Sequence, residues 1–157
     1  MLFLGCLTIF IWLKMSSAIL TDKVVGFVGT GKISSCLVRG YCSAGDGGRP
    51  AKVLVSPRNA DKAAALQKDY PDLVEIGTDN EDVVRRSDVV FVGLLPKVAR
   101  EVLPKLPFGG DNSGKLVISM MAAIMIEELC GLVDVPNTQI IRTVPLPSAA
   151  RREGPIL

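Results

Sequence analysis

The chain has 157 residues, which is the size of one ordinary domain. Apolar residues make up 48% of the sequence and charged residues 22%. These values are typical of globular proteins and argue against disorder along the whole chain. The formal net charge of +2 is too small to predict nucleic acid or an anionic membrane surface as the main partner.

The sequence has four cysteines and no histidine. The cysteines are Cys6, Cys36, Cys42 and Cys130, and no two of them form a C-x-x-C pair. This spacing predicts neither a structural zinc site nor a disulfide framework, and it is typical of a reducing compartment such as the cytoplasm. Without histidine, the Ser-His-Asp and Cys-His catalytic arrangements are excluded. We therefore expect no metal site and assign no catalytic residue.

Residues 1–20 form an apolar N-terminal extension with more than one interpretation. The apolar run ends at Lys14 and is shorter than the roughly 20 residues that a membrane-spanning helix needs. A secretory signal would have a basic segment before the apolar run, and this chain has none. Three interpretations stay open: an upstream extension with translation starting at Met15, a signal or anchor, and an apolar arm buried on the domain. We expect no membrane partner, and residues 21–157 are predicted to form one domain.

From Lys23 onward, short apolar runs alternate with helical patterns, which is typical of a parallel α/β sheet. In the first half, strands are predicted at 23–28, 52–56 and 73–76. The first helix is predicted at 32–44. The second is a helix that Asn59 caps and Pro71 ends, and the third runs from Asp79 or Asn80 to about Arg86.

The second half continues the same alternation. Strands are predicted at 88–93, 116–119 and 139–143, and helices at 96–106 and 124–132. Residues 107–114 are expected to form a loop, and Pro145-Leu146-Pro147 is expected to turn the chain after the last strand. The fold class is therefore α/β, a Rossmann-type doubly wound and mainly parallel sheet with helices on both faces.

The first strand runs directly into Gly29-Thr30-Gly31-Lys32-Ile33-Ser34, which matches the G-x-G-x-x-G/A turn with serine in the third, small position. Gly29 permits the tight turn, and Gly31 lets the backbone approach a pyrophosphate. The N-terminus of the following helix offers free N–H groups and a positive dipole end to an anion. The strand before and the amphipathic helix after favour nucleotide binding over a purely structural turn.

The end of the second strand carries Ser56, Arg58 and Asn59, and no acidic residue. NAD-binding domains usually place an Asp or Glu here for the ribose hydroxyl. The guanidinium of Arg58 can instead bind a 2′-phosphate, with neutral hydrogen bonds from Ser56 and Asn59. This pattern favours NADPH as the cofactor, with NADH possible. The alternative is that Arg58 is a solvated surface residue and Asn59 only a helix cap.

The ends of the fourth and fifth strands are expected to line the same crevice, because ligands bind at the carboxyl ends of the strands in open α/β sheets. This rule selects Gly93, Leu94, Leu95 and Pro96, and then residues 120–123. Close approach of the backbone to a ligand, more than side-chain chemistry, is their expected use.

Five stretches of the sequence, in this order, resemble the N-terminal NADP-binding domain of the pyrroline-5-carboxylate reductase family. They are VGFVGTGKISSCLVRGY, VSPRNADKAAAL, TDNEDVVRRSDVVFVGLLPKV, KLVISMMAAI and IIRTVPLPSAARREGPIL. The resemblance covers nearly all of the chain from Lys23, and the combination is more specific than any single motif. It implies an enzyme that reduces the imine of pyrroline-5-carboxylate to proline with a hydride from NADPH or NADH.

The resemblance also implies where the cofactor lies. It implies that the turn at Thr30 holds the pyrophosphate along Gly29, Gly31, Lys32 and Ile33, that Ser56, Arg58 and Asn59 face the 2′-phosphate, that Asn80 lies near the adenosine ribose, and that Gly93 to Pro96 touch the cofactor.

Four departures from the family pattern are visible. Leu95 stands where the family commonly has a lysine, and Ala123 where it has a glycine. Leu146 replaces an asparagine that the family places near the nicotinamide and the substrate. The C-terminal all-helical domain, which forms the family's dimer and supplies substrate-binding Ser and Thr groups, is absent from this sequence.

Three functional hypotheses follow. The first is an NADPH-dependent reductase of the pyrroline-5-carboxylate type in proline biosynthesis, with this chain supplying the cofactor-binding half. The second is a stand-alone NADP-binding module without reductase activity, as the missing domain indicates. The third is a related reductase with another imine or a hydroxy acid as substrate, as Leu146 indicates. The expected partner is a small-molecule imine, and a homo-oligomer is expected if the full-length protein has the helical domain.

Overall fold

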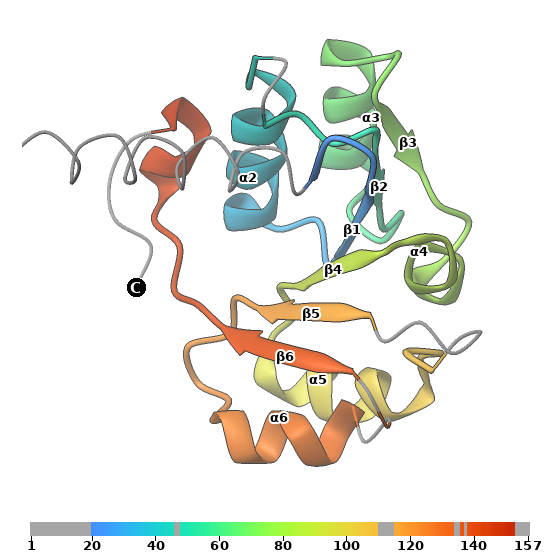
Figure 1. The fold of residues 1–157 in the computed structure, drawn as a ribbon, viewed down its shortest axis with the longest axis vertical. Helices are drawn as coiled ribbons and strands as arrows, with labels where there is room; N and C mark the ends of the chain where they lie inside the picture. Colours follow the sequence, from blue (N-terminus) through green and yellow to red (C-terminus); the bar gives the residue numbers. More distant parts are fainter. Residues whose placement is uncertain (1–19, 46–47, 110–114, 134–135, 137, 153–157) are drawn as a thin grey trace, which may run out of the picture.

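The computed structural model describes residues 20–45, 48–109, 115–133, 136 and 138–152 (Figure 1). Residues 1–19 of the extension predicted at 1–20, residues 110–114 of the loop predicted at 107–114, and the last five residues of the domain predicted at 21–157 lie outside this part. Within it, six parallel strands form one sheet in the order β3-β2-β1-β4-β5-β6. The strands are β1 (Val24–Val28), β2 (Lys52–Val55), β3 (Val74–Ile76), β4 (Val89–Val92), β5 (Leu116–Ser119) and β6 (Gln139–Arg142). This order confirms the doubly wound fold class.

The helices cover the two faces of the sheet separately. Helices α2 (Lys32–Cys42) and α3 (Ala60–Asp69) lie on one face, and α4 (Asn80–Arg86), α5 (Pro96–Val102) and α6 (Ile126–Val133) lie on the other (Figure 1). This division follows from right-handed crossovers, because the chain moves one way along the sheet from β1 to β3 and the opposite way from β4 to β6. The reversal between β1 and β4 leaves a crevice at their carboxyl ends, which is the expected ligand site.

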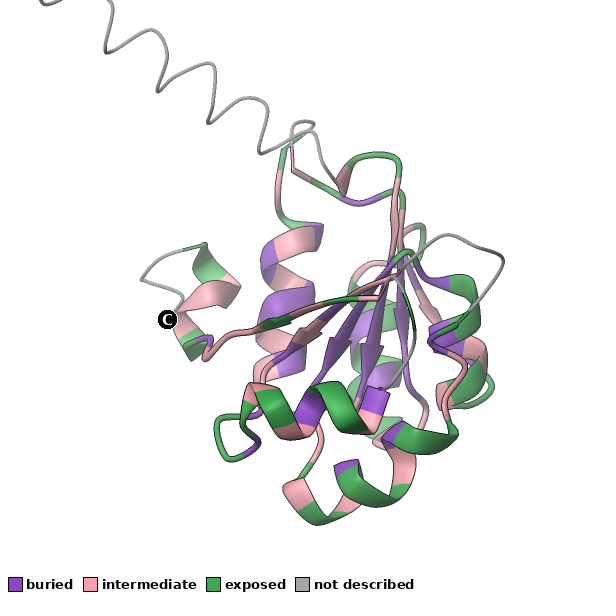
Figure 2. Cartoon of the chain, turned by 60° about the horizontal axis from the view of Figure 1, so that its bottom comes forward, coloured by how far each residue is buried: buried purple, intermediate pink, exposed green. Residues whose placement is uncertain are grey.

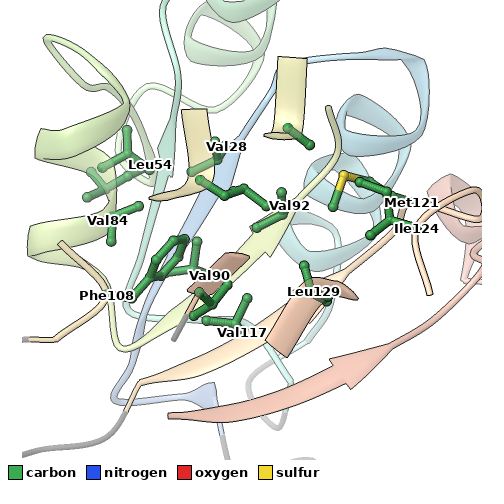
Figure 3. Close-up of a cluster of buried hydrophobic side chains, with 14 residues drawn as sticks. Val28, Leu54, Val84, Val90, Val92, Phe108, Val117, Met121, Ile124 and Leu129 are labelled. Atoms are coloured by element: carbon green, nitrogen blue, oxygen red, sulfur yellow. The ribbon is translucent and has the colours of Figure 1, made fainter. Parts of the chain in front are cut away.

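The alternation of side chains along each strand builds two cores. Val25 and Phe27 point toward α2 and α3, where the Phe27 ring stacks on Phe91 with a centroid distance of 4.9 Å. Val28 points to the opposite face and joins a cluster with Val90 (Figure 3). The central strands are buried on both faces, and exposed residues lie on the outer sides of the helices, in the loops and on the edge strand β6 (Figure 2). Such burial explains why the central strands read as continuous apolar runs.

The predicted strands and helices are found at nearly the predicted positions, with three differences in the helices. The helix predicted at 96–106 ends at Val102 and continues as a 3₁₀ turn, η2 (Leu103–Lys105). Pro104 lacks the N–H that a longer α-helix would need. The helix predicted at 124–132 begins at Ile126, because residues 121–124 form a turn that buries Ile124 completely. The helix predicted at 32–44 ends at Cys42.

The helix caps also differ from the prediction at one position. Asn59 occupies the N-cap position of α3, as predicted, but its side chain makes no capping hydrogen bond. At α4 the cap is Asp79, whose carboxylate accepts a hydrogen bond from the N–H of Asp82 at 2.8 Å. The Asp79 cap was one of the two alternatives predicted for that helix.

After β6 the chain does more than turn. Residues Pro147–Arg151 form a 3₁₀ helix, η3, which packs against α2 (Figure 1). The contact is close at Gly40, where an added Cβ would collide with the carbonyl oxygen of Ala149. No helix in the described ranges is long and apolar enough to cross a membrane.

Candidate nucleotide-binding site

The turn after β1 requires glycine at its first position. Gly29 has φ of +96°, a conformation that residues with a side chain rarely adopt. A Cβ at Gly29 would lie 2.5 Å from the carbonyl oxygen of Gly93 and 3.0 Å from a methyl carbon of Leu94. The turn is therefore wedged against the end of β4, and this close approach brings the carboxyl ends of β1 and β4 together.

The turn is supported from below by the end of β2. The N–H of Gly29 donates a hydrogen bond to the hydroxyl oxygen of Ser56 at 2.9 Å. The hydroxyl of Thr30 donates to the carbonyl oxygen of Ser56 at 2.6 Å. Ser56 and Thr30 are 0% and 3% exposed, so these bonds are shielded from water. The structure thus places the Ser56 hydroxyl under the turn, whereas the sequence had led us to expect it at a 2′-phosphate.

Helix α2 begins with an open N-terminus. Gly31 is its N-cap, no side chain caps the helix, and its first turn has no acidic residue. A Cβ at Gly31 would meet nothing within 4 Å, so the backbone here borders open space. The unpaired N–H groups and the positive dipole end of an 11-residue helix therefore face outward beside the turn. An anion of pyrophosphate size fits this arrangement.

Ser34 fastens the same helix to the sheet. Its hydroxyl donates to the carbonyl oxygen of Gly29 at 2.5 Å, and the residue is 1% exposed. The Ser34 hydroxyl oxygen also lies 2.9 Å from the position that a Cβ of Gly93 would take. The small third residue of the motif and Gly93 therefore fit against each other, so the start of α2 packs close to the end of β4.

A cavity of about 550 Å³ opens above the turn. Three segments line it, namely the turn after β1, the start of α3 and the start of α5 with the loop before it. The lining residues are Gly29, Thr30, Gly31, Arg58, Asn59, Ala60, Asp61, Gly93, Leu94, Leu95 and Val98. The volume falls within the range of small-molecule and cofactor pockets.

Most of the residues that the sequence selected meet in this cavity, and some do not. The selected residues outside the lining are Lys32, Ile33, Ser56, Asn80, Pro96 and residues 120–123. Lys32 is exposed and Ile33 half-buried in the first turn of α2. Asn80 is half-buried at the start of α4. Lys32 and Ile33 can still approach an anion through their backbone N–H groups, because they open the uncapped helix.

Three lining residues were missed by the sequence reasoning. Ala60 and Asp61 form the first turn of α3, and Val98 lies in the first turn of α5. A usable signal was available, since the first turn of any helix that follows a strand faces the same crevice as the strand end.

The cavity wall is divided by chemistry. Leu94, Leu95 and Val98 make one side apolar, and Leu95 is 75% exposed. Arg58 and Asp61 are the charged side chains among the lining residues. Neither forms an ion pair with another residue in the described ranges. The site therefore offers an apolar surface, one free guanidinium and one free carboxylate beside an open helix N-terminus.

A hydrogen bond outside the cavity joins the end of β6 to the loop after β5. The guanidinium of Arg142, at the end of β6, donates to the carbonyl oxygen of Ala122 at 2.6 Å. Ala122 and Ala123 are exposed, while Met121 is buried in the core. Leu146 is 40% exposed. None of these residues lines the cavity.

Comparison with known proteins agrees with this geometry. The family described as NADP oxidoreductase coenzyme F420-dependent matches residues 24–123. The pyrroline-5-carboxylate reductase of Methanosarcina acetivorans is 28% identical over 129 residues, which cover 79% of this chain and 44% of the relative.

Two solved structures show the same fold. The pyrroline carboxylate reductase of Plasmodium falciparum, with NADP bound, aligns with a TM-score of 0.66 and 21% identity, covering 87% of this chain and 47% of that one. The imine reductase of Myxococcus stipitatus in complex with NADP+ aligns with a TM-score of 0.60 and 16% identity, covering 81% and 43%.

The chain spans less than half the length of each of these three proteins. The sequence resemblance to pyrroline-5-carboxylate reductases, restricted to the NADP-binding part, is confirmed by the match to the Methanosarcina enzyme. The match to the family model covers more than half of the residues of this chain. The chain therefore belongs to the family described as NADP oxidoreductase coenzyme F420-dependent.

Proposed function

We propose that this chain binds NADPH in the cavity above Gly29 and supplies the cofactor-binding half of a reductase acting on pyrroline-5-carboxylate. The observation that carries the proposal is the meeting of three parts in one cavity. They are the turn at Gly29, the open N-terminus of α2 and the unpaired guanidinium of Arg58. Each matches one chemical part of a dinucleotide that carries a 2′-phosphate. On this proposal, residues 21–157 are the nucleotide-binding domain.

The described residues fit such a cofactor. The empty space at Gly31 admits a pyrophosphate against the backbone, and the first N–H groups of α2, from Lys32 and Ile33, donate to it. Arg58 binds the 2′-phosphate, and the side chain of Asn59 is free to help because it does not cap α3. Asn80 is kept in this proposal near the adenosine ribose.

The loop after β4 would serve the uncharged parts of the cofactor. Gly93 gives close backbone approach, and Leu94 and Leu95 offer apolar surface that an aromatic ring can cover. Pro96, at the start of α5, fixes the direction in which this loop leaves the strand. We assign Ser56 a supporting role under the turn, in place of direct contact.

The chemistry of the reaction lies mainly in the cofactor. NADPH, when bound, supplies a hydride to the carbon of a C=N bond, and the nitrogen takes its proton from water or from a hydroxyl group. The residues of this chain bind and orient, and the buried Thr30–Ser56 bonds keep the turn in place while they do so. No residue is assigned as a proton donor.

A second candidate keeps the cofactor and changes the substrate. Leu146, 40% exposed after β6, is apolar where the reductase family has an asparagine, and an imine reductase shares the fold. Both observations favour another imine as substrate. A stand-alone NADP-binding module is the remaining alternative, because the residues that line the cavity bind and orient a cofactor and none of them is assigned to catalysis. A homo-oligomer and a cytoplasmic location, where NADPH is supplied, belong to the first candidate.

The first test is calorimetric titration of the full chain with NADPH and NADH, with Arg58→Ala beside it. We expect NADPH to bind, and Arg58→Ala to weaken NADPH by roughly 10-fold to 100-fold while it leaves NADH nearly unchanged. The matched control is Arg49→Ala, which removes the same charge from an exposed arginine outside the cavity.

Failure of both cofactors to bind would refute the proposal. Binding of NADPH that Arg58→Ala does not alter would refute the assignment of Arg58. Turnover of pyrroline-5-carboxylate, compared with a second cyclic imine that lacks the carboxylate, then separates the first candidate from the second.

A further inference from the structure

Asp61 lines the same cavity as Arg58, and no motif or resemblance assigned it a role. It is the second residue of α3, it is exposed, and it forms no ion pair with another residue in the described ranges. Its carboxylate is therefore available to a bound molecule. A free carboxylate and a free guanidinium in one cavity act oppositely on any ligand that carries charge.

The other charged residues near the cavity do not line it, so Arg58 and Asp61 are the charged groups that a bound adenosine meets. Lys32 opens α2, Lys62 follows Asp61 on α3, and Lys97 follows Pro96 on α5. All three are exposed, and none lines the cavity. Arg58 and Asp61 are thus the two charged side chains in the cavity wall, within the part of the chain that the structure describes.

The two residues favour different nucleotides on physical grounds. A 2′-phosphate carries close to two negative charges near neutral pH, so Arg58 attracts it and Asp61 repels it. A ribose 2′-hydroxyl is a hydrogen-bond donor, and a carboxylate accepts from it. Asp61 is the second residue of α3 and lines the cavity together with Arg58, so both charges face the same bound nucleotide.

We propose that Asp61 is a specificity-determining residue that opposes Arg58, so that the cavity discriminates less between NADPH and NADH than Arg58 alone would dictate. The inference rests on the proposed function, because it concerns the same cavity. Beyond that function, Asp61 is the residue that allows NADH to bind. Asp61 acts by direct contact with the adenosine ribose and by repulsion of a 2′-phosphate.

The test is the ratio of NADPH to NADH affinity, measured by calorimetry on the full chain. Asp61→Asn keeps the shape and removes the charge. We expect it to strengthen NADPH and weaken NADH, which moves the ratio by about fivefold or more toward NADPH. The adenosine fragments 2′,5′-ADP and 5′-AMP should shift in the same directions, since they carry the ribose difference without the nicotinamide.

The control is Glu101→Gln, which removes one negative charge from an exposed residue of α5 outside the cavity. It should leave the ratio unchanged. If Asp61→Asn has a ratio of NADPH to NADH affinity within twofold of that of the native chain, while NADPH binding still depends on Arg58, the role of Asp61 is refuted and the proposed function stands. If the native chain binds neither nucleotide, the proposed function fails and this inference fails with it.

Discussion

The carbonyl oxygen of Gly93 lies where a side chain at Gly29 would have to go, 2.5 Å from the ideal Cβ position. Gly29 also has a φ of +96°, so alanine there meets backbone strain and a backbone atom together. We expect Gly29→Ala to lower the free energy of unfolding by about 2 kcal/mol or more, and to abolish nucleotide binding. Urea denaturation followed by circular dichroism measures the first effect, and an unchanged unfolding midpoint would contradict it.

Gly31 gives the matched comparison in the same turn. Its φ is −83°, and a Cβ there would meet nothing within 4 Å. Gly31→Ala should therefore fold with native stability, or gain about 0.4–1 kcal/mol from the stiffer unfolded chain. NADPH affinity should fall by about tenfold or more, because the methyl group would stand where the pyrophosphate approaches. Equal affinity of Gly31→Ala and the native chain for NADPH would place the pyrophosphate elsewhere.

Ser56 is expected to matter for stability although it does not line the cavity. The Ser56 hydroxyl is fully buried and accepts a hydrogen bond from the N–H of the half-buried Gly29. Ser56→Ala leaves that N–H without an acceptor, which should cost about 1–3 kcal/mol in the free energy of unfolding. The control is Ser43→Ala, because the Ser43 hydroxyl donates to Gly40 at 3.2 Å and the residue is exposed. A cost of Ser56→Ala no larger than that of Ser43→Ala would show that the bond does not hold the turn.

Arg142 is predicted to fix the loop after β5. Its guanidinium donates to the carbonyl oxygen of Ala122 across 20 residues of sequence. Arg142→Met should speed hydrogen exchange at residues 120–124 and leave NADPH affinity nearly unchanged, because Arg142 does not line the cavity. Arg142→Lys should give an intermediate exchange rate, since it keeps a donor but loses the planar geometry. Native exchange rates in Arg142→Met would refute this role.

The buried thiol of Cys42 predicts a dependence of stability on pH. Burial raises the pKa of Cys42 from its ordinary value of 9.0 to about 11, with Arg49 and Arg39 acting in the opposite direction. The folded chain thus holds this proton more tightly than the unfolded chain. The resulting stability is fully present below about pH 9 and is lost as the pH rises toward about 11.

Cys42→Ala is the variant that isolates this effect. We expect the native chain to lose stability faster than Cys42→Ala between about pH 9 and about pH 11, measured by urea denaturation at each pH. Burial also raises the pKa of Tyr41, but Tyr41 is present in both proteins and cancels in the difference. A constant difference in the free energy of unfolding across this range would contradict the prediction.

The strands could be predicted because buried strands appear in the sequence as runs of apolar residues. Residues 89–92 are buried on both faces, and they read as an unbroken apolar run. The helix ends were harder, because each depends on one local contact. Pro104 converts the end of α5 into a 3₁₀ turn, and the burial of Ile124 delays α6 by two residues.

The turn of the site was predictable from its glycines, while the roles of its neighbours were not. Ser56 and Arg58 are two residues apart, and only the three-dimensional structure shows that the first points under the turn and the second lines the cavity. Asp61 carried no motif, because its position depends on where α3 begins relative to β2. The 3₁₀ helix η3 was missed because its partner, Gly40, lies more than 100 residues earlier.

The position of β1 has a consequence for synthesis of the chain. β1 is made before any other strand, yet it lies in the middle of the sheet and pairs with both β2 and β4. Its first N–H, from Val24, also donates to the carboxylate of Asp88, 64 residues later. A nascent chain on the ribosome can pair β1 with β2, and β2 with β3, early, but the other edge of β1 stays open until β4 has emerged from the exit tunnel. During that interval the edge of Val25 to Val28 is available to other chains, so we expect chaperone binding to concentrate there.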